Sequence, residues 1–152
     1  MTKIYCGDAR DIPAIMPVME DAFDPSYGEA WTAGQCLTSL TLPSSKLWIA
    51  ERDGQVAAFA ICRWVLDEEE LLMIGVARKY RRKKLASALL DHLIENAISC
   101  GRNQLFLEVR DGNEAIEFYK QSGFSKIGRR QNYYTGKDNR KSDAVTMRRQ
   151  ID

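Results

Sequence analysis

The spacing of apolar residues along the chain separates helical from extended segments. The segments whose apolar residues recur at helical spacing are the predicted helices: Asp11–Phe23, Trp31–Leu40, Leu85–Ser99 and Asn113–Ser122. Their ends carry matching signals, because Asp11 and Thr32 are candidate N-caps and Gly101 and Gly123 follow the last two helices. We therefore expect helices in both halves of the chain.

Shorter apolar runs predict strands: Leu47–Glu51, Val56–Val65, Glu70–Val76, Gln104–Val109, Phe124–Arg129 and Ala144–Arg148. Asp53-Gly54, between the first two runs, is a strong hairpin signal, and short connections there predict an antiparallel meander. A polar loop, Asn132–Asp143, separates the last two strands. With a strand before the first helix, the predicted order is β-α-α-β-β-β-α-β-α-β-β. This order predicts an α+β fold with a mixed, mostly antiparallel sheet and helices on both faces.

Length and composition are those of one globular domain. The 152 residues are 45% apolar and 28% charged without an internal linker, so residues 1–152 are predicted to form a single domain. Lys and Arg total 22 against 21 Asp and Glu, a balance that argues against direct nucleic-acid binding. Because the chain has neither an apolar run of about 18 residues nor a signal peptide, we expect a cytoplasmic protein with no membrane partner.

Metal-ligating residues are few and scattered. The cysteines, at positions 6, 36, 62 and 100, form no C-x-x-C pair, and His92 is the single histidine. This inventory predicts no metal site and no disulfide framework. A histidine-based nucleophile would have to use His92, which lies inside a predicted helix and is expected to be an ordinary helix residue.

The most informative segment joins a predicted strand to a predicted helix. Every residue from Arg78 to Lys84 except Tyr80 is basic, and the helix begins at Leu85. Cations at a helix N-terminus are unfavourable by some tenths of a kcal/mol each, whereas a bound phosphate is favoured by the same dipole and by free N–H groups. The segment therefore favours a phosphate-bearing cofactor over the alternatives, a solvated basic turn or a nucleic-acid patch.

The same segment and the second half of the chain resemble known acetyltransferases. Val76, Tyr80-Arg81 and Lys84-Leu85-Ala86-Ser87-Ala88-Leu89-Leu90 resemble the cofactor motif of the GCN5-related N-acetyltransferase (GNAT) superfamily. Within it, the bacterial ribosomal-protein-alanine N-acetyltransferases carry motifs similar to these: Leu107-Glu108-Val109-Arg110-Asp111-Gly112-Asn113, Phe118-Tyr119-Lys120-Gln121-Ser122-Gly123-Phe124, Arg130-Gln131-Asn132-Tyr133-Tyr134 and Asp143-Ala144-Val145-Thr146-Met147. The resemblance covers nearly the whole chain and implies a GNAT-like fold.

The resemblance implies roles for two catalytic residues. Glu108 matches the residue that accepts a proton from the acceptor amine, and its place at the end of an apolar strand would raise its pKa through partial burial. Tyr119 matches the acid that protonates the leaving thiolate. The alternatives are a plain surface glutamate at position 108 and a core aromatic residue at position 119.

The resemblance also implies acetyl-CoA as cosubstrate and a set of residues that bind it. These are the strand residues Ile74, Gly75 and Val76, the pyrophosphate loop Arg81, Arg82, Lys83, Lys84, Leu85, Ala86 and Ser87, and a further contact, Asn113. The loop departs from the family pattern because it has no glycine, which permits close approach and unusual φ values. This difference puts the affinity for the cofactor in doubt more than the existence of the site.

By resemblance, the acceptor is the N-terminal alanine of small-subunit ribosomal protein number eighteen, a ribosomal partner with a basic start. The acidic segments Asp67–Glu70 and Glu20–Asp24 could attract a basic peptide or form solvated turns, and Tyr133-Tyr134 could line a peptide groove or pack. Two other functions remain open. One is acetyl transfer to a small amine or a lysine side chain, and the other is a non-catalytic CoA-fold module that binds a ribosomal partner.

Overall fold

The computed structural model describes all residues, 1–152, and its elements follow the predicted order. They are β1 (Thr2–Gly7), α1 (Ile12–Ala22), α2 (Ala33–Leu40), β2 (Ser45–Arg52), β3 (Gln55–Val65), β4 (Glu68–Val76), α3 (Leu85–Ser99), β5 (Gln104–Arg110), α4 (Ala115–Gln121), β6 (Ser125–Thr135) and β7 (Lys141–Gln150). Short 3-10 turns, η1 to η4, occupy Ala9–Asp11, Pro25–Tyr27, Arg78–Tyr80 and Lys137–Asn139.

The strands form one seven-stranded sheet in the order β1-β2-β3-β4-β5-β7-β6. All neighbours pair antiparallel except β4 and β5, which are parallel, so the predicted mixed, mostly antiparallel sheet is confirmed. The turn Asp53-Gly54 joins β2 to β3 with positive φ at both residues, as a tight hairpin requires. The α3 crossover connects the two parallel strands.

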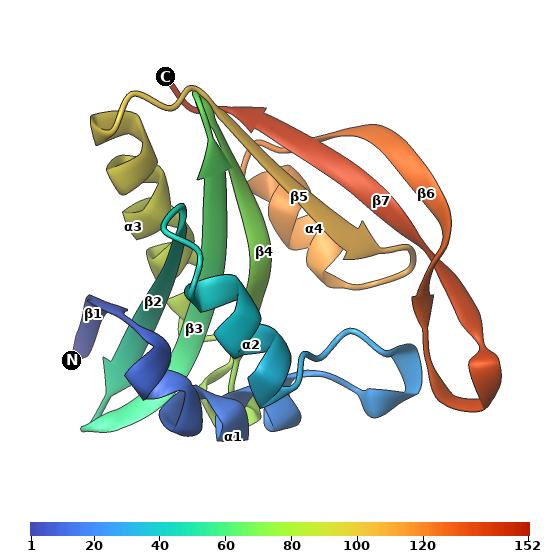
Figure 1. The fold of residues 1–152 in the computed structure, drawn as a ribbon, viewed down its shortest axis with the longest axis horizontal. Coiled ribbons are helices and arrows are strands. Elements are labelled where there is room, and N and C mark those ends of the chain that lie inside the picture. The colour runs from blue at the N-terminus through green and yellow to red at the C-terminus, as the bar shows by residue number, and fades with distance from the viewer.

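The helices cover both faces of the centre of the sheet. In Figure 1, α1 and α2 lie on one face, whereas α3 and α4 lie on the other. Every residue of β3 from Ala57 to Cys62 is buried, as expected for a strand that is covered on both sides. No helix is long and apolar enough to cross a bilayer.

Two local predictions were wrong in detail. Asp11 makes no cap hydrogen bond to α1; instead Asp8 and Asp11 form a capping box around the η1 turn. The loop predicted over Asn132–Asp143 is mostly strand, because β6 continues to Thr135 and β7 begins at Lys141. Almost every β6 residue is exposed, so this edge strand has no apolar alternation that could have revealed it. By contrast, Thr32 caps α2 as predicted.

The acidic segment Asp67–Glu70 is a solvated turn only at its start, where Asp67 and Glu68 are exposed, and it is not a continuous acidic surface. Within it, Glu69 is only 1% exposed, and its carboxylate lies 3.3 Å from the guanidinium of Arg102, which is also buried and covers the Trp64 ring. Glu70 points to the other face of β4 and pairs with Arg63. Strand alternation therefore removes Glu69 from any acceptor surface.

His92 and the cysteines take structural positions. The half-buried His92 ring packs edge-on against Trp48, with ring centroids 4.8 Å apart, so the prediction of an ordinary helix residue is confirmed. All four cysteines are free; Cys36 and Cys62 are buried, and Cys6 and Cys100 are exposed.

Candidate active site

A cleft opens where β4 and β5 separate. Their parallel pairing joins only Glu68–Leu71 to Gln104–Leu107, and the strands then diverge, as Figure 1 shows. The space between them is a cavity of about 890 Å³, which is lined by residues of both strands, the α1–α2 connection, the η3 turn, α3, α4 and β6. Backbone groups of Met73–Val76 therefore have no β5 partner and remain available to a ligand.

Gly75 lets the α1 end pack against β4. A Cβ atom at this position would lie 3.0 Å from the Phe59 ring and 3.3 Å from both Ala22 and Phe23. Because these neighbours leave little room for any side chain, the backbone at Gly75 stays close to α1. Ile74 and Val76, on either side and both predicted as cofactor contacts, are half-buried and line the cavity.

The turn before α3 presents unpaired backbone donors. The N–H groups from Arg82 to Ser87 donate to no acceptor within the protein, and Lys84, at the N-cap position of α3, offers no side-chain cap. Arg82 and Lys84 have φ of 63° and 61°, in the left-handed region that normally favours glycine. The loop thus keeps a glycine-type backbone although it contains no glycine. The helix dipole and these donors suit an anion.

The basic residues of this turn divide into anchoring and free groups. The backbone N–H of Arg78 donates to Asp21 at 2.6 Å, and Arg81 donates to the Ala22 carbonyl at 2.9 Å, so both arginines fasten the turn to the end of α1. Arg82 and Lys84 have no such partner and line the cavity, whereas the exposed Lys83 does not line it. Asp21 is therefore an anchor for this turn and not a free acidic group for an acceptor.

Glu108 enters the cleft from the point where β5 leaves β4. Its side chain is 13% exposed, and Oε1 lies 3.1 Å from Nε of Arg130, whereas Oε2 is buried without a hydrogen-bond partner. Burial, chiefly, and the negative charge of Glu70 raise the pKa of Glu108, and Arg130 opposes this rise. The rise in the Glu108 pKa agrees with the prediction made from its place at the end of an apolar strand. A carboxyl of this kind can accept a proton nearer neutral pH.

Tyr119 is both a core residue and a wall of the cavity. Its ring, 6% exposed on α4, packs against Phe118 and Phe124 with centroids 5.3 and 5.6 Å away. Burial raises the pKa of its hydroxyl, as do the nearby Tyr134 and Glu29, so the phenol stays protonated over the physiological range. The phenol can therefore donate a proton to a group in the cleft.

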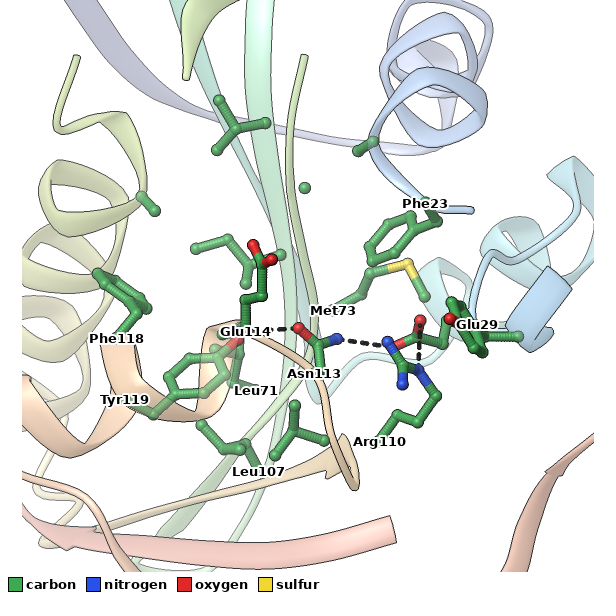
Figure 2. Close-up of a pocket in the computed structure, with 18 of the residues that line it drawn as sticks. Phe23, Glu29, Leu71, Met73, Leu107, Arg110, Asn113, Glu114, Phe118 and Tyr119 are labelled. Atoms are coloured by element: carbon green, nitrogen blue, oxygen red, sulfur yellow. Dashed lines mark hydrogen bonds and ion pairs between the residues drawn. The ribbon is translucent and has the colours of Figure 1, made fainter. Parts of the chain in front are cut away.

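Glu29 was not predicted, and it organises the side of the cleft opposite α3. Figure 2 shows its carboxylate bonded to Arg110 and Asn113, at 3.1 and 2.9 Å. The Arg110 guanidinium also stacks on Tyr27, 3.7 Å from the ring centroid. Asn113 Oδ1 accepts from the backbone N–H of Ala115, so both ends of this side chain have partners. Asn113, predicted as a cofactor contact, lines the cavity and ties the start of α4 to the α1–α2 connection.

Two glycines close the same side of the cleft. A Cβ atom on Gly28 would overlap the Thr135 carbonyl, and one on Gly136 would overlap the Ser26 carbonyl. The η2 turn therefore packs backbone to backbone against the tip of the β6–β7 hairpin, and Figure 1 shows the α1–α2 connection reaching this tip. Tyr133 and Tyr134 lie on the same hairpin and line the cavity.

A comparison with family models agrees with this architecture. The model described as the acetyltransferase (GNAT) family matches residues 15–124, well over half of the chain. The chain belongs to the GNAT acetyltransferase family. The splayed strands and the turn before α3 both lie within the matched residues.

Curated relatives of this GNAT protein share one description. The [ribosomal protein bS18]-alanine N-acetyltransferase of Escherichia coli strain K12 is 44% identical over 97 residues, which cover 63% of this chain and 65% of that relative. The protein of the same name from Haemophilus ducreyi is 35% identical over 118 residues, 77% of this chain and 81% of the relative. The chain thus aligns with just under two thirds of the E. coli relative.

Solved structures of GNAT proteins cover more of the chain. The ribosomal-protein-S18-alanine N-acetyltransferase from Escherichia coli has a TM-score of 0.88 at 33% identity, over 99% of this chain and 94% of that chain. Ard1 from Thermoplasma volcanium has a TM-score of 0.83 at 27% identity, over 99% and 97% of the two chains. The likeness therefore includes the first strand and the final hairpin, which lie outside the family match.

The backbone of the turn before α3 leads to a stability prediction. Replacing Lys84 with glycine should relieve about 1–2 kcal/mol of left-handed strain and lose about 0.4–1 kcal/mol to the freer unfolded chain. We expect Lys84→Gly to raise the free energy of unfolding, measured by urea denaturation, by about 0.5–1 kcal/mol. Lys83→Gly is the matched control and should lower it, since Lys83 has no positive φ. An equal decrease in the free energy of unfolding in both variants would show that the backbone at Lys84 is not strained.

Proposed function

We propose that this chain is a protein N-α-acetyltransferase that moves the acetyl group of acetyl-CoA to the N-terminal alanine of ribosomal protein bS18. One observation carries the proposal: a single cleft joins a helix N-terminus with unpaired N–H donors to a largely buried carboxyl with a raised pKa. The description shared by the curated relatives supports the acceptor. A ribosomal acceptor is also consistent with the expected cytoplasmic location.

The residues at the α3 end of the cleft fit coenzyme A. The unpaired N–H groups from Arg82 to Ser87 and the free cations of Arg82 and Lys84 suit its pyrophosphate. The unpaired edge of β4 at Ile74, Gly75 and Val76 suits the pantetheine arm, whose amides need hydrogen-bond partners. When bound, the coenzyme supplies a thioester as acyl donor and a thiolate as leaving group.

Residues of the chain polarise the thioester carbonyl and carry out the two proton transfers that the reaction needs. A backbone N–H of the β4 edge polarises the thioester carbonyl as negative charge develops on its oxygen. Glu108 takes a proton from the acceptor amine, directly or through a water, and Tyr119 gives its phenolic proton to the leaving sulfur. The tyrosine needs no lowered pKa for this step, because it donates only as charge appears on the sulfur.

The acceptor chemistry favours an α-amine over a lysine side chain. The reference pKa is about 7.7–8 for an α-amino group and about 10.4 for lysine, so a carboxyl base removes the α-amine's proton more easily. Glu114 lines the cavity without an ion-pair partner, beside the ion-paired Glu70 and Glu108, and its negative charge supports a basic N-terminal segment as acceptor. The non-catalytic alternative depended on the loss of glycine from the phosphate loop, but the loop keeps the glycine-type backbone.

Mass spectrometry of two peptides tests the proposed function. We expect acetyl transfer from acetyl-CoA to a peptide with the bS18 N-terminus and free α-amine. We expect at least tenfold less transfer to a peptide whose N-terminus is blocked and whose one amine is a lysine side chain. Preferred acetylation of the lysine peptide would favour the second enzyme alternative. Tight binding of acetyl-CoA without transfer to either peptide would favour the binding module.

Replacing Glu108 with glutamine tests the base. Glutamine keeps the shape and cannot take up the proton, so kcat/KM for the alanine peptide should fall by roughly 10²–10⁴-fold. The affinity for acetyl-CoA, measured by calorimetry, should stay within about twofold, since Glu108 lies away from the phosphate end. Full activity of the variant at neutral pH would remove Glu108 from the mechanism.

Replacing Tyr119 with phenylalanine separates catalysis from packing. The ring contacts with Phe118 and Phe124 remain, and only the hydroxyl is lost. We therefore expect nearly unchanged thermal stability and acetyl-CoA affinity, with kcat at least about tenfold lower. A variant that is less stable but keeps its kcat would show that Tyr119 is only a core aromatic residue, and solvent would then be the first candidate acid.

A further inference from the structure

Arg130 is placed to act on the reaction through Glu108. It extends from edge strand β6 across β7, and its Nε lies 3.1 Å from Glu108 Oε1 on β5. Glu108 stands in register with Thr146 and Gly128, so no bulky side chain from β7 or β6 intervenes. The guanidinium also lies 5.6 Å from the ring centroid of Tyr133, a residue that lines the cavity.

We propose that Arg130 is the positioning residue of Glu108: its ion pair with Oε1 fixes the orientation of the carboxylate at the cleft and favours the ionised form that accepts the proton of the acceptor amine. The inference rests on the proposed function and names a further residue of that site. Glu108 Oε2 is buried and has no donor in the protein, whereas Oε1 has an ion-pair partner. Arg130 is thus the side chain that forms an ion pair with this carboxylate, and it does so at one oxygen alone.

A second arginine stands close enough to compete for this role. Arg110 and Arg130 are both in register with Ala144, one on each side of β7. Arg110, however, forms an ion pair with Glu29 at 3.1 Å and stacks on Tyr27. These contacts hold its guanidinium on Glu29 and not on Glu108. Arg130 has no carboxylate partner other than Glu108. The two arginines therefore serve different carboxylates.

The electrostatics give Arg130 a measurable effect. The charged or titratable groups that face Glu108 are Arg130 and Tyr134 of β6 and Glu70 of β4, and β7 presents only Thr146. Burial and Glu70 favour the protonated acid, whereas Arg130 favours the carboxylate. Removal of the Arg130 charge must therefore raise the Glu108 pKa, so that a smaller fraction of the base is ionised at a given acidic pH.

The direct test is an NMR titration of the Glu108 side-chain carboxyl carbon in the ligand-free protein. Because the Arg130 side chain is mostly exposed, we expect the Glu108 pKa in Arg130→Gln to rise by about 0.2–0.7 unit, the range for an exposed ion pair. Arg130→Lys, which keeps a charge, should show less than half of this rise. Arg129→Gln is the matched control: Arg129 is adjacent but pairs with Asp111 and Asp143, so it should leave the Glu108 pKa unchanged.

The pH dependence of kcat with the alanine peptide completes the test. In Arg130→Gln the acidic limb should move to higher pH, with activity about two- to fivefold below wild type at pH values below the Glu108 pKa and within about twofold near pH 9. Arg129→Gln should follow wild type. An unchanged Glu108 pKa in Arg130→Gln, or an equal rise in Arg129→Gln, would overturn the inference. Failure of the wild-type protein to acetylate the peptide would instead overturn the proposed function, and the NMR titration would still report on the pair.

Discussion

The hydrogen-bond ladder between β4 and β5 stops at Leu71 and Leu107, and the site depends on this early end. Each strand stays fixed beyond that point, because β4 is still paired with β3 and β5 with β7. Two rigid halves of one sheet therefore diverge and leave a wedge between them. The wedge exposes unpaired backbone on β4 and directs Glu108 from β5 into the same space. A fully paired sheet of the same sequence would have no room for a substrate.

The phosphate end of the wedge shows that backbone conformation matters more there than residue type. Arg82 and Lys84 take positive φ although each pays roughly 1–2 kcal/mol for the left-handed region. Anchors just before these residues offset this strain, since Arg78 and Arg81 bind the end of α1 and Tyr80 donates to Gln55. The resulting turn points its N–H groups outward and adds cations beside them. Glycine is thus one way to reach this geometry, and a well-anchored turn is another.

Sequence patterns predicted the parts of the fold and site that depend on neighbouring residues. The element order, the Asp53-Gly54 turn and the capping of α2 follow from local signals, and so does the place of Glu108 at the end of an apolar strand. The missed features depend on partners far away in the sequence. Glu29 meets Arg110, and Gly28 meets the β6–β7 hairpin, only after the chain has folded. Glu69 looked solvated because nothing local reveals that Arg102 is buried beside it.

Two arginine–carboxylate pairs lie around the cleft, Arg110 with Glu29 and Arg130 with Glu108. Because the pairs are separate, the position of Glu29 affects the charge environment of Glu108. Glu29 and Glu108 are both largely buried carboxylates, and Arg110 and Arg130 flank the same β7 position. If Glu29 were not in place, Arg110 would be an unpaired cation two residues along β5 from Glu108, and it would favour the ionised carboxylate. Glu29 lies on the α1–α2 connection, which the Gly28 contact holds against the β6–β7 hairpin. The packing of that connection thus sets which cation acts on Glu108, so the shape of the acceptor side and the basicity of the carboxylate are determined together.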